Sequence, residues 1–248
     1  MEQKHQFPTE EVTLPSKGLL YPKESPLSKG VIEIKYMTAK EEDILTNQNY
    51  IQKGTVIDKL LKSLIVTPID YNDLLTGDKN AILIAARILG YGANYEFKFN
   101  DKDASIDLSE LEDKELDESL IVDNKNEFDF TLPMSKAKVT FKFLTHSDDI
   151  KVDKEVEGIR KINKVASEGT IRLKHVILSI NGSYEQKDIR NFIDNTLLAR
   201  DARALRNYIN EIQPGINLKT EVEFKDGYVE ENVNLPIGLN FFWPDAEL

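Results

Sequence analysis

The side chains with the most capacity for chemistry are the carboxylates crowded between residues 100 and 118. Carboxylates that converge at the ends of strands bind Mg²⁺ and support the hydrolysis of phosphate esters. This stretch has weak strand patterning, however, and a dense run of like charge is usually a solvated surface. A metal-dependent hydrolase or nuclease that uses Asp101, Asp103 or Asp107 is therefore an alternative hypothesis that the pattern disfavours.

Side chains that commonly serve as nucleophiles, bases or soft metal ligands are sparse. The chain has no cysteine, and its three histidines, His5, His146 and His175, are far apart in the sequence. Gly90-Tyr91-Gly92 lacks the third glycine or the Lys-Ser/Thr pair of a phosphate-binding loop. We expect no catalytic residue, no bound metal and no cofactor, so the chain is predicted not to be an enzyme.

The balance of charge is acidic, with 43 Asp and Glu residues against 32 Lys and Arg residues and a formal net charge of −11. Nucleic acids and anionic membranes attract cationic surfaces, so this balance argues against both as direct ligands. No apolar run reaches the roughly 18 residues that span a bilayer. Arg200, Arg203 and Arg206 recur on one helical face, which we interpret as salt-bridged or as docked on an acidic partner.

Apolar residues gather near both ends of the chain, where segments normally fray unless something holds them. The candidate partner-binding residues are Leu14, Pro15, Lys17, Leu19, Leu20 and Tyr21 near the N-terminus, and Phe241, Phe242 and Trp243 near the C-terminus. We expect a neighbouring subunit to capture the N-terminal segment, and residues 1–22 to be mobile in the isolated protein. The C-terminal aromatic residues either dock on the chain's own core or anchor another subunit, and we predict that a partner covers part of them.

The elements that position these residues follow from periodicity and from turn signals. Repeated prolines predict an extended segment over residues 1–30. Helical spacing predicts helices over residues 38–47 (with a Thr38–Glu41 capping box), 55–66, 79–89, 147–165, 186–198 and 201–212. Alternation predicts strands over residues 31–37 and 94–99 and hairpins over 128–144 and 218–235, whereas residues 170–180 fit a helix better than a strand.

Together these elements predict an α+β fold, with a mainly helical body, small antiparallel β-hairpins and extended N- and C-terminal segments. We divide the chain into an N-terminal arm (1–30), an N-terminal α+β region with hairpins (31–145) and a C-terminal helical region (146–248). The last region includes the terminal hairpin and the aromatic tail.

Several short motifs occur in an order that resembles the T4-type baseplate hub subunit family of contractile-tailed phages. They are Leu14-Pro15-Ser16-Lys17-Gly18-Leu19-Leu20-Tyr21, Thr76-Gly77-Asp78-Lys79, Ala86-Arg87-Ile88-Leu89-Gly90-Tyr91-Gly92, Phe130-Thr131-Leu132-Pro133 and Phe241-Phe242-Trp243-Pro244. Each motif alone is weak, but the resemblance spans nearly the whole chain.

The resemblance implies a structural role in the hub of a phage baseplate, with no catalytic residue to carry over. It implies that the partners are other baseplate or hub proteins in a hetero-oligomeric assembly. It also implies a location in the virion tail after assembly in the host cytoplasm. The alternative within the same setting is an assembly chaperone that binds hub proteins transiently and is absent from the mature virion.

Overall fold

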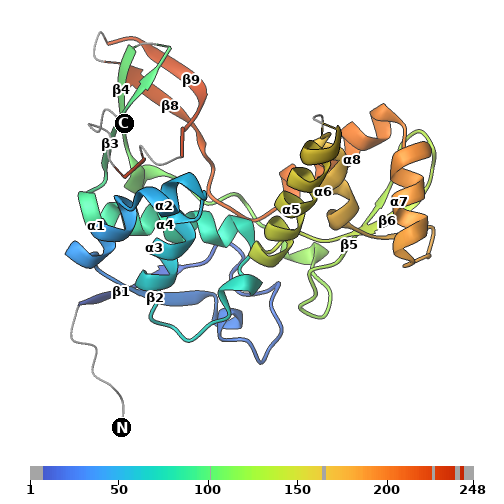
Figure 1. Cartoon of the computed structure of the whole chain (residues 1–248), viewed down its shortest axis with the longest axis horizontal. Coiled ribbons are helices and arrows are strands. Elements are labelled where there is room, and N and C mark those ends of the chain that lie inside the picture. Colours follow the sequence, from blue (N-terminus) through green and yellow to red (C-terminus); the bar gives the residue numbers. More distant parts are fainter. Residues whose placement is uncertain (1–7, 101, 164–165, 225–226, 238–240, 243–248) are drawn as a thin grey trace.

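Figure 1 shows the chain as a computed structural model, which describes residues 8–100, 102–163, 166–224, 227–237 and 241–242. The helices are α1 (Ala39–Leu45), α2 (Gln48–Gln52), α3 (Val56–Leu64), α4 (Thr76–Tyr91), α5 (His146–Asn163), α6 (Glu168–Val176), α7 (Gln186–Asn195) and α8 (Ala199–Ile212). The strands are β1 (Thr9–Thr13), β2 (Val31–Lys35), β3 (Asn94–Phe99), β4 (Lys102–Asp107), β5 (Phe128–Thr131), β6 (Lys138–Phe141), β7 (Ile177–Ile180), β8 (Lys219–Phe224) and β9 (Val229–Asn234). The predicted α+β class is confirmed.

Local sequence signals explain most of the helices. The Thr38 amide and hydroxyl both donate to Glu41 Oε2, at 3.0 and 2.6 Å, and this capping box starts α1 as predicted. In α3, the residues at helical spacing (Val56, Leu60, Leu61 and Leu64) are all buried. An apolar stripe of this kind holds a short helix to its neighbours, because such a helix is marginal on its own.

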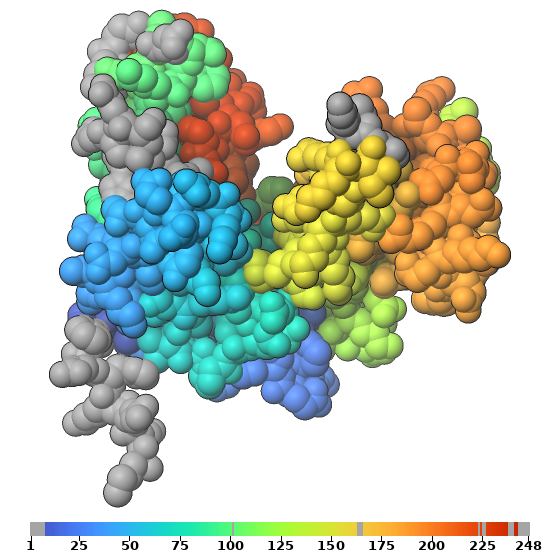
Figure 2. Space-filling model, viewed as in Figure 1, coloured from blue at the N-terminus to red at the C-terminus, as the bar shows by residue number. Residues whose placement is uncertain are grey.

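Three antiparallel sheets join segments of the chain. The first pairs β1 with β2, the second has the order β3-β4-β8-β9, and the third has the order β5-β6-β7. Figure 1 shows β8 and β9 beside β3 and β4, while α5 to α8 surround the third sheet in the other half of the molecule. Figure 2 shows the resulting two lobes, with an open notch between the β8–β9 hairpin and α5.

The terminal hairpin belongs with the N-terminal half, which corrects the division of the chain at residue 145. β8 pairs with β4 through Ala104 opposite Phe224, across more than a hundred residues of sequence. The residues that drive this pairing form a small buried cluster on one face of the sheet: Ala104, Val222, Phe224, Val233 and Leu235. Such a non-local pairing depends on matching apolar faces and is invisible in local periodicity.

Two further elements differ from the sequence-based expectations. Residues 9–13 form β1, because Pro8 and Pro15 flank this strand without interrupting its pairing, from Thr9 opposite Lys35 to Thr13 opposite Val31. The helix expected over residues 170–180 ends at Val176, and Ile177–Ile180 instead forms β7 on the edge of β6. The β-branched residues in this stretch and the open edge of β6 together favour the strand.

Candidate interaction site

The N-terminal turn of α4 holds a buried carboxylate that organises the N-terminal segment. Asp78 is fully buried and accepts hydrogen bonds from the Ser16 amide at 2.9 Å, the Ser16 hydroxyl at 2.6 Å and the Tyr21 hydroxyl at 2.6 Å. The Tyr21 oxygen in turn accepts from the Leu75 amide at 3.0 Å. Burial raises the pKa of Asp78, and the hydrogen bonds from Ser16 and Tyr21 only partly offset that effect. The cluster of Ser16, Tyr21 and Asp78 therefore fastens two distant motifs to each other.

Close backbone approaches reinforce this arrangement. Gly18 has a φ of +76°, and a Cβ at this position would lie 2.5 Å from the Ser28 carbonyl oxygen. A Cβ on Gly77 would lie 1.9 Å from the carbonyl oxygen of Pro214, which follows α8. Only glycine fits at either position. The N-terminal segment is therefore folded tightly on itself at Gly18, and the N-terminal turn of α4 is packed at Gly77 against the chain that leaves the second lobe.

The N-terminal candidate residues are placed mainly in the chain's own core. Leu14, Pro15, Leu20 and Tyr21 are buried. The structure thus packs these side chains within the fold of the same chain, while capture by a neighbour in the assembly and mobility of residues 1–22 stay predictions. Residues 1–7 lie outside the described residues.

Two of the N-terminal candidates remain accessible. Lys17 is exposed and forms an ion pair with Glu118 at 2.7 Å, and Leu19 is half-buried. An exposed ion pair of this kind contributes little to stability, so Lys17 stays available to a partner. Their partner-binding role stays a prediction.

The opposite end of α4 fastens the C-terminal segment. The buried guanidinium of Arg87 donates to the carbonyl oxygens of Phe241 at 2.8 Å, Gly92 at 2.7 Å and Asn94 at 3.2 Å. Burial lowers the pKa of Arg87, and satisfied carbonyl contacts keep this cation tolerable inside the protein. Phe241 also packs edge-to-face on the Tyr95 ring, with centroids 4.9 Å apart.

The C-terminal candidates thus divide into buried and undescribed residues. Phe241 and Phe242 are fully buried within the chain's own core. For these two side chains the structure favours the alternative of docking on the chain's own core, and cover by a partner in the assembly stays untested. Trp243 lies outside the described residues.

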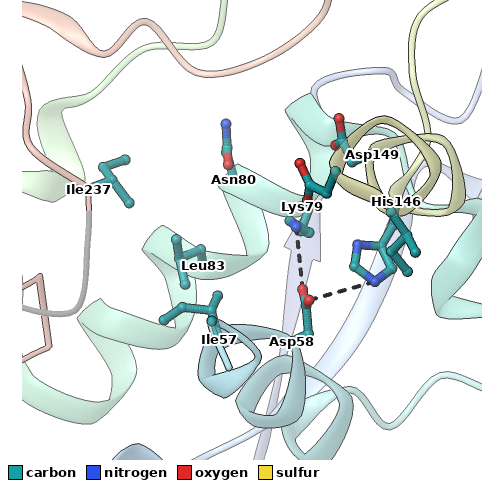
Figure 3. Close-up of a pocket in the computed structure, with 11 residues that line it drawn as sticks. Ile57, Asp58, Lys79, Asn80, Leu83, His146, Asp149 and Ile237 are labelled. Atoms are coloured by element: carbon teal, nitrogen blue, oxygen red, sulfur yellow. Dashed lines mark hydrogen bonds and ion pairs between the residues drawn. The ribbon is translucent and has the colours of Figure 1, made fainter. Parts of the chain in front are cut away.

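A polar pocket lies between α3, α4 and the start of α5, with a volume of about 330 Å³. Figure 3 shows Asp58 pointing toward both Lys79 and His146. Asp58 lies 3.3 Å from the Lys79 ammonium and 3.7 Å from His146 Nε2, and it accepts a hydrogen bond from the Tyr71 hydroxyl at 2.9 Å. Burial lowers the pKa of His146, so the imidazole is neutral at pH 7.

Two of the three carboxylates that line this pocket, Asp58 and Asp149, already have partners from the same chain, and the third, Asp153, is exposed. On the far side from Asp58, Asp149 accepts from the Thr76 hydroxyl at 2.9 Å and pairs with Arg172 at 2.6 Å. Across the described ranges, no group of three His, Cys, Asp or Glu side chains is arranged to hold a metal ion. The pocket is best described as a polar junction between the two lobes.

The acidic and basic candidates from the sequence do not converge. Asp107 accepts from the Ser109 amide at 2.8 Å at the end of β4, Asp103 is on the same strand, and Asp101 lies outside the described residues. Arg200 and Arg203 are exposed on α8. None of the helices among the described residues combines the length and the apolar composition of a membrane-spanning segment.

Asp78 and Arg87, the two residues that hold the end segments, were not identified as functional sites from the sequence. Asp78 and Arg87 interrupt the apolar stripe of α4, and both are buried. A charged residue inside an apolar helix face is the sequence signal that could have found them, because buried charge requires specific partners. Of the five resembling motifs, the first contacts α4 at Asp78, the second and third lie within it or at its end, and the last reaches it through Phe241, whereas the fourth belongs to β5 in the other lobe.

Comparison with known families adds one finding. A family model described as "T4 bacteriophage base plate protein" matches residues 9–243. The search of curated proteins found no match. The search of solved structures also found none. The matched range begins with β1 and extends past Phe242, so it includes every described helix and strand.

Proposed function

We propose, because the chain belongs to the T4 bacteriophage base plate protein family, that it is a subunit of the baseplate hub of a contractile phage tail. Membership makes it a structural protein of the phage baseplate and associates it with other baseplate proteins. The hub position and the mode of assembly are the parts that we propose. In this role the protein acts through contacts with neighbouring subunits.

The observation that carries the proposal is the extent of the family match. Residues 9–243 include both lobes and all three sheets, so no described element is left over for a separate catalytic module. The order of motifs from Leu14 to Phe242 also resembles the hub type within this setting. A structural role therefore accounts for the whole described fold.

The way the chain ends are held supports a specific mode of assembly. The Asp78 cluster and the Arg87 contacts fasten both end segments to α4 of the same chain. A subunit of this kind is folded before it meets its neighbours. It docks through exposed surfaces of a preformed fold rather than by exchanging arms, and such interfaces change little in backbone on binding.

Quantitative mass spectrometry of purified tails and isolated baseplates tests this function. We expect the protein in both, at a constant ratio to the other hub proteins, and cross-linked to them. The control for specificity compares tails from a phage that lacks the gene with tails from the same phage after complementation in trans. Detection in assembly intermediates but not in virions would assign the protein to transient assembly instead, and detection only with peripheral baseplate proteins would contradict the hub position.

A further inference from the structure

An exposed turn in the second lobe is held rigidly by a buried carboxylate. Asp201, in the first turn of α8, is fully buried and accepts from the amides of Met134 at 2.7 Å and Ser135 at 2.9 Å. Although burial raises its pKa, the hydrogen bonds from these two amides outweigh that effect and lower it. The carboxylate is therefore ionised at neutral pH, and it fixes the β5–β6 turn against the start of α8.

The rigid turn places two large apolar side chains on the surface. Met134 is 49% exposed at the tip of the turn, and Leu198, the residue before α8, is 48% exposed. Both residues lie next to Asp201. The amide of Met134 donates to the Asp201 carboxylate, and the carbonyl of Leu198 accepts from the amide of Ala202, the residue after Asp201, at 2.9 Å. Exposed apolar side chains on a rigid surface, surrounded by polar residues, are typical of protein interfaces.

The surroundings of these two side chains are cationic in an acidic protein. Lys136, Arg200 and Arg203 are exposed, and none of them is in an ion pair with another described residue. Residues 131–138 and 196–207 contain one acidic residue, Asp201, and that carboxylate is buried and hydrogen-bonded. The net charge of the whole chain is −11, so the charge of this surface is opposite in sign to that of the protein as a whole.

We propose that this surface, the turn–helix patch, docks an acidic segment of another baseplate protein. The patch consists of Pro133, Met134, Lys136, Leu198, Arg200 and Arg203. Its occupant carries carboxylates that pair with the three cations and an apolar side chain that covers Met134 and Leu198. The inference rests on the proposed function, because it assumes that the protein is assembled among other baseplate subunits.

The residue composition of the patch favours a protein over a nucleic acid as the occupant. Single-stranded nucleic acid is bound by cationic grooves with aromatic side chains on which bases stack. The turn–helix patch has no aromatic residue, and its centre is aliphatic. Methionine and arginine, both present in the patch, are instead enriched at protein interfaces, where opposite charge sets the orientation and the association rate.

Charge reversal in the patch tests the proposal in complemented phage. We expect Arg200→Glu/Arg203→Glu to reduce incorporation into purified baseplates at least tenfold, and Arg200→Lys/Arg203→Lys to retain most of it. The matched control is Lys40→Glu/Lys98→Glu, which changes the net charge by the same amount at two exposed positions in the first lobe. Circular dichroism of each purified variant confirms that it is folded.

The outcomes separate this inference from the proposed function. If the Arg200→Glu/Arg203→Glu variant is incorporated into baseplates at the same level as the wild-type protein, the proposed role of the patch is wrong and the proposed function still stands. An equal loss of incorporation in the Lys40→Glu/Lys98→Glu control would also overturn the patch, because the change in net charge alone would then explain the defect. Absence of the wild-type protein from baseplates would contradict the function itself.

Photo-cross-linking identifies the occupant directly. We replace Leu198 with p-benzoylphenylalanine, irradiate assembled baseplates and map the cross-linked peptide by mass spectrometry. We expect a peptide of another baseplate protein with several carboxylates and an apolar residue at the attachment point. Attachment to nucleic acid, to a second copy of this chain or to a basic peptide would overturn the proposal, as would efficient incorporation with no cross-link.

Discussion

Ser16 and Asp78 are 62 positions apart in the sequence and are joined by two hydrogen bonds, one from the Ser16 amide and one from its hydroxyl. Both residues are fully buried, so water cannot replace either bond without opening the core. At the other end of the same helix, Arg87 donates to the carbonyl of Phe241. α4 is therefore the element to which both end segments of the described chain are fastened.

Replacing Tyr21 with Phe tests the Asp78 cluster. The change removes the hydroxyl that donates to Asp78 and accepts from the Leu75 amide, which leaves two buried polar groups without this partner. We expect the free energy of unfolding, measured in urea, to fall by about 2–3 kcal/mol. Tyr36→Phe is the matched control, because the Tyr36 hydroxyl donates to Glu10 at the surface, and its unfolding midpoint should not change. Equal effects of the two substitutions would show that the cluster is not a stabilising centre.

Phe241→Ala tests the docking of the C-terminal segment. The side chain is fully buried against Tyr95 and Phe242, and its loss leaves a cavity in the core. We expect a loss of about 3–5 kcal/mol in unfolding free energy. Val122→Ala, at a position that is 64% exposed, should change it by less than about 0.5 kcal/mol. Truncation after Pro236 should likewise destabilise the fold, and a truncated protein as stable as the full chain would restore the interface interpretation of Phe241 and Phe242.

Stability should decrease in acid through Glu41. Burial alone raises the pKa of this carboxyl, but hydrogen bonds from Lys35, Ser63 and Thr38 outweigh that effect and lower the pKa from 4.5 to about 2. A lowered folded-state pKa contributes stability that is present above pH 4.5 and is lost as the pH falls toward 2. The contribution is up to about 3 kcal/mol. Urea titrations at a series of pH values should therefore show a shallower acid decline for Glu41→Gln than for wild type. The same decline in Glu41→Gln and in the exposed control Glu24→Gln would rule out this assignment.

Divalent metals should not affect stability. The sequence has no cysteine, and the described residues include no group of three His, Cys, Asp or Glu side chains arranged to hold an ion. We expect the melting temperature to be the same with and without EDTA, since no bound metal contributes to folding. A decrease of several degrees in EDTA that Mg²⁺ or Zn²⁺ reverses would reveal a site formed by other residues.

Features encoded in consecutive residues could be predicted from the sequence. The capping box of Thr38 and Glu41 and the apolar stripe of α3 each act within a few residues, so the pattern determines the element. The fold class and most helix positions follow from such signals. The family resemblance likewise depended on the order of local motifs, which the match to residues 9–243 confirms at the level of the baseplate family.

Features that depend on distant partners could not be predicted in this way. The prolines around residues 9–13 predicted an extended segment for a neighbouring subunit to capture, but β2 of the same chain supplies the hydrogen bonds that make this segment a strand. Leu20 and Tyr21 were correctly identified as side chains that need cover, and only the position of Asp78 showed that the cover comes from the same chain. The partner of an apolar segment is a tertiary property, which local pattern does not contain.

A cryo-EM map of the assembled baseplate tests the central claim most directly. The account predicts density for this fold in the central hub, with residues 14–21 and Phe241 packed on their own α4 and with the turn–helix patch against an acidic neighbour. A fully interpreted map without this fold would contradict the structural role. A map in which residues 14–21 or Phe241 and Phe242 extend into another subunit would contradict the preformed subunit described above.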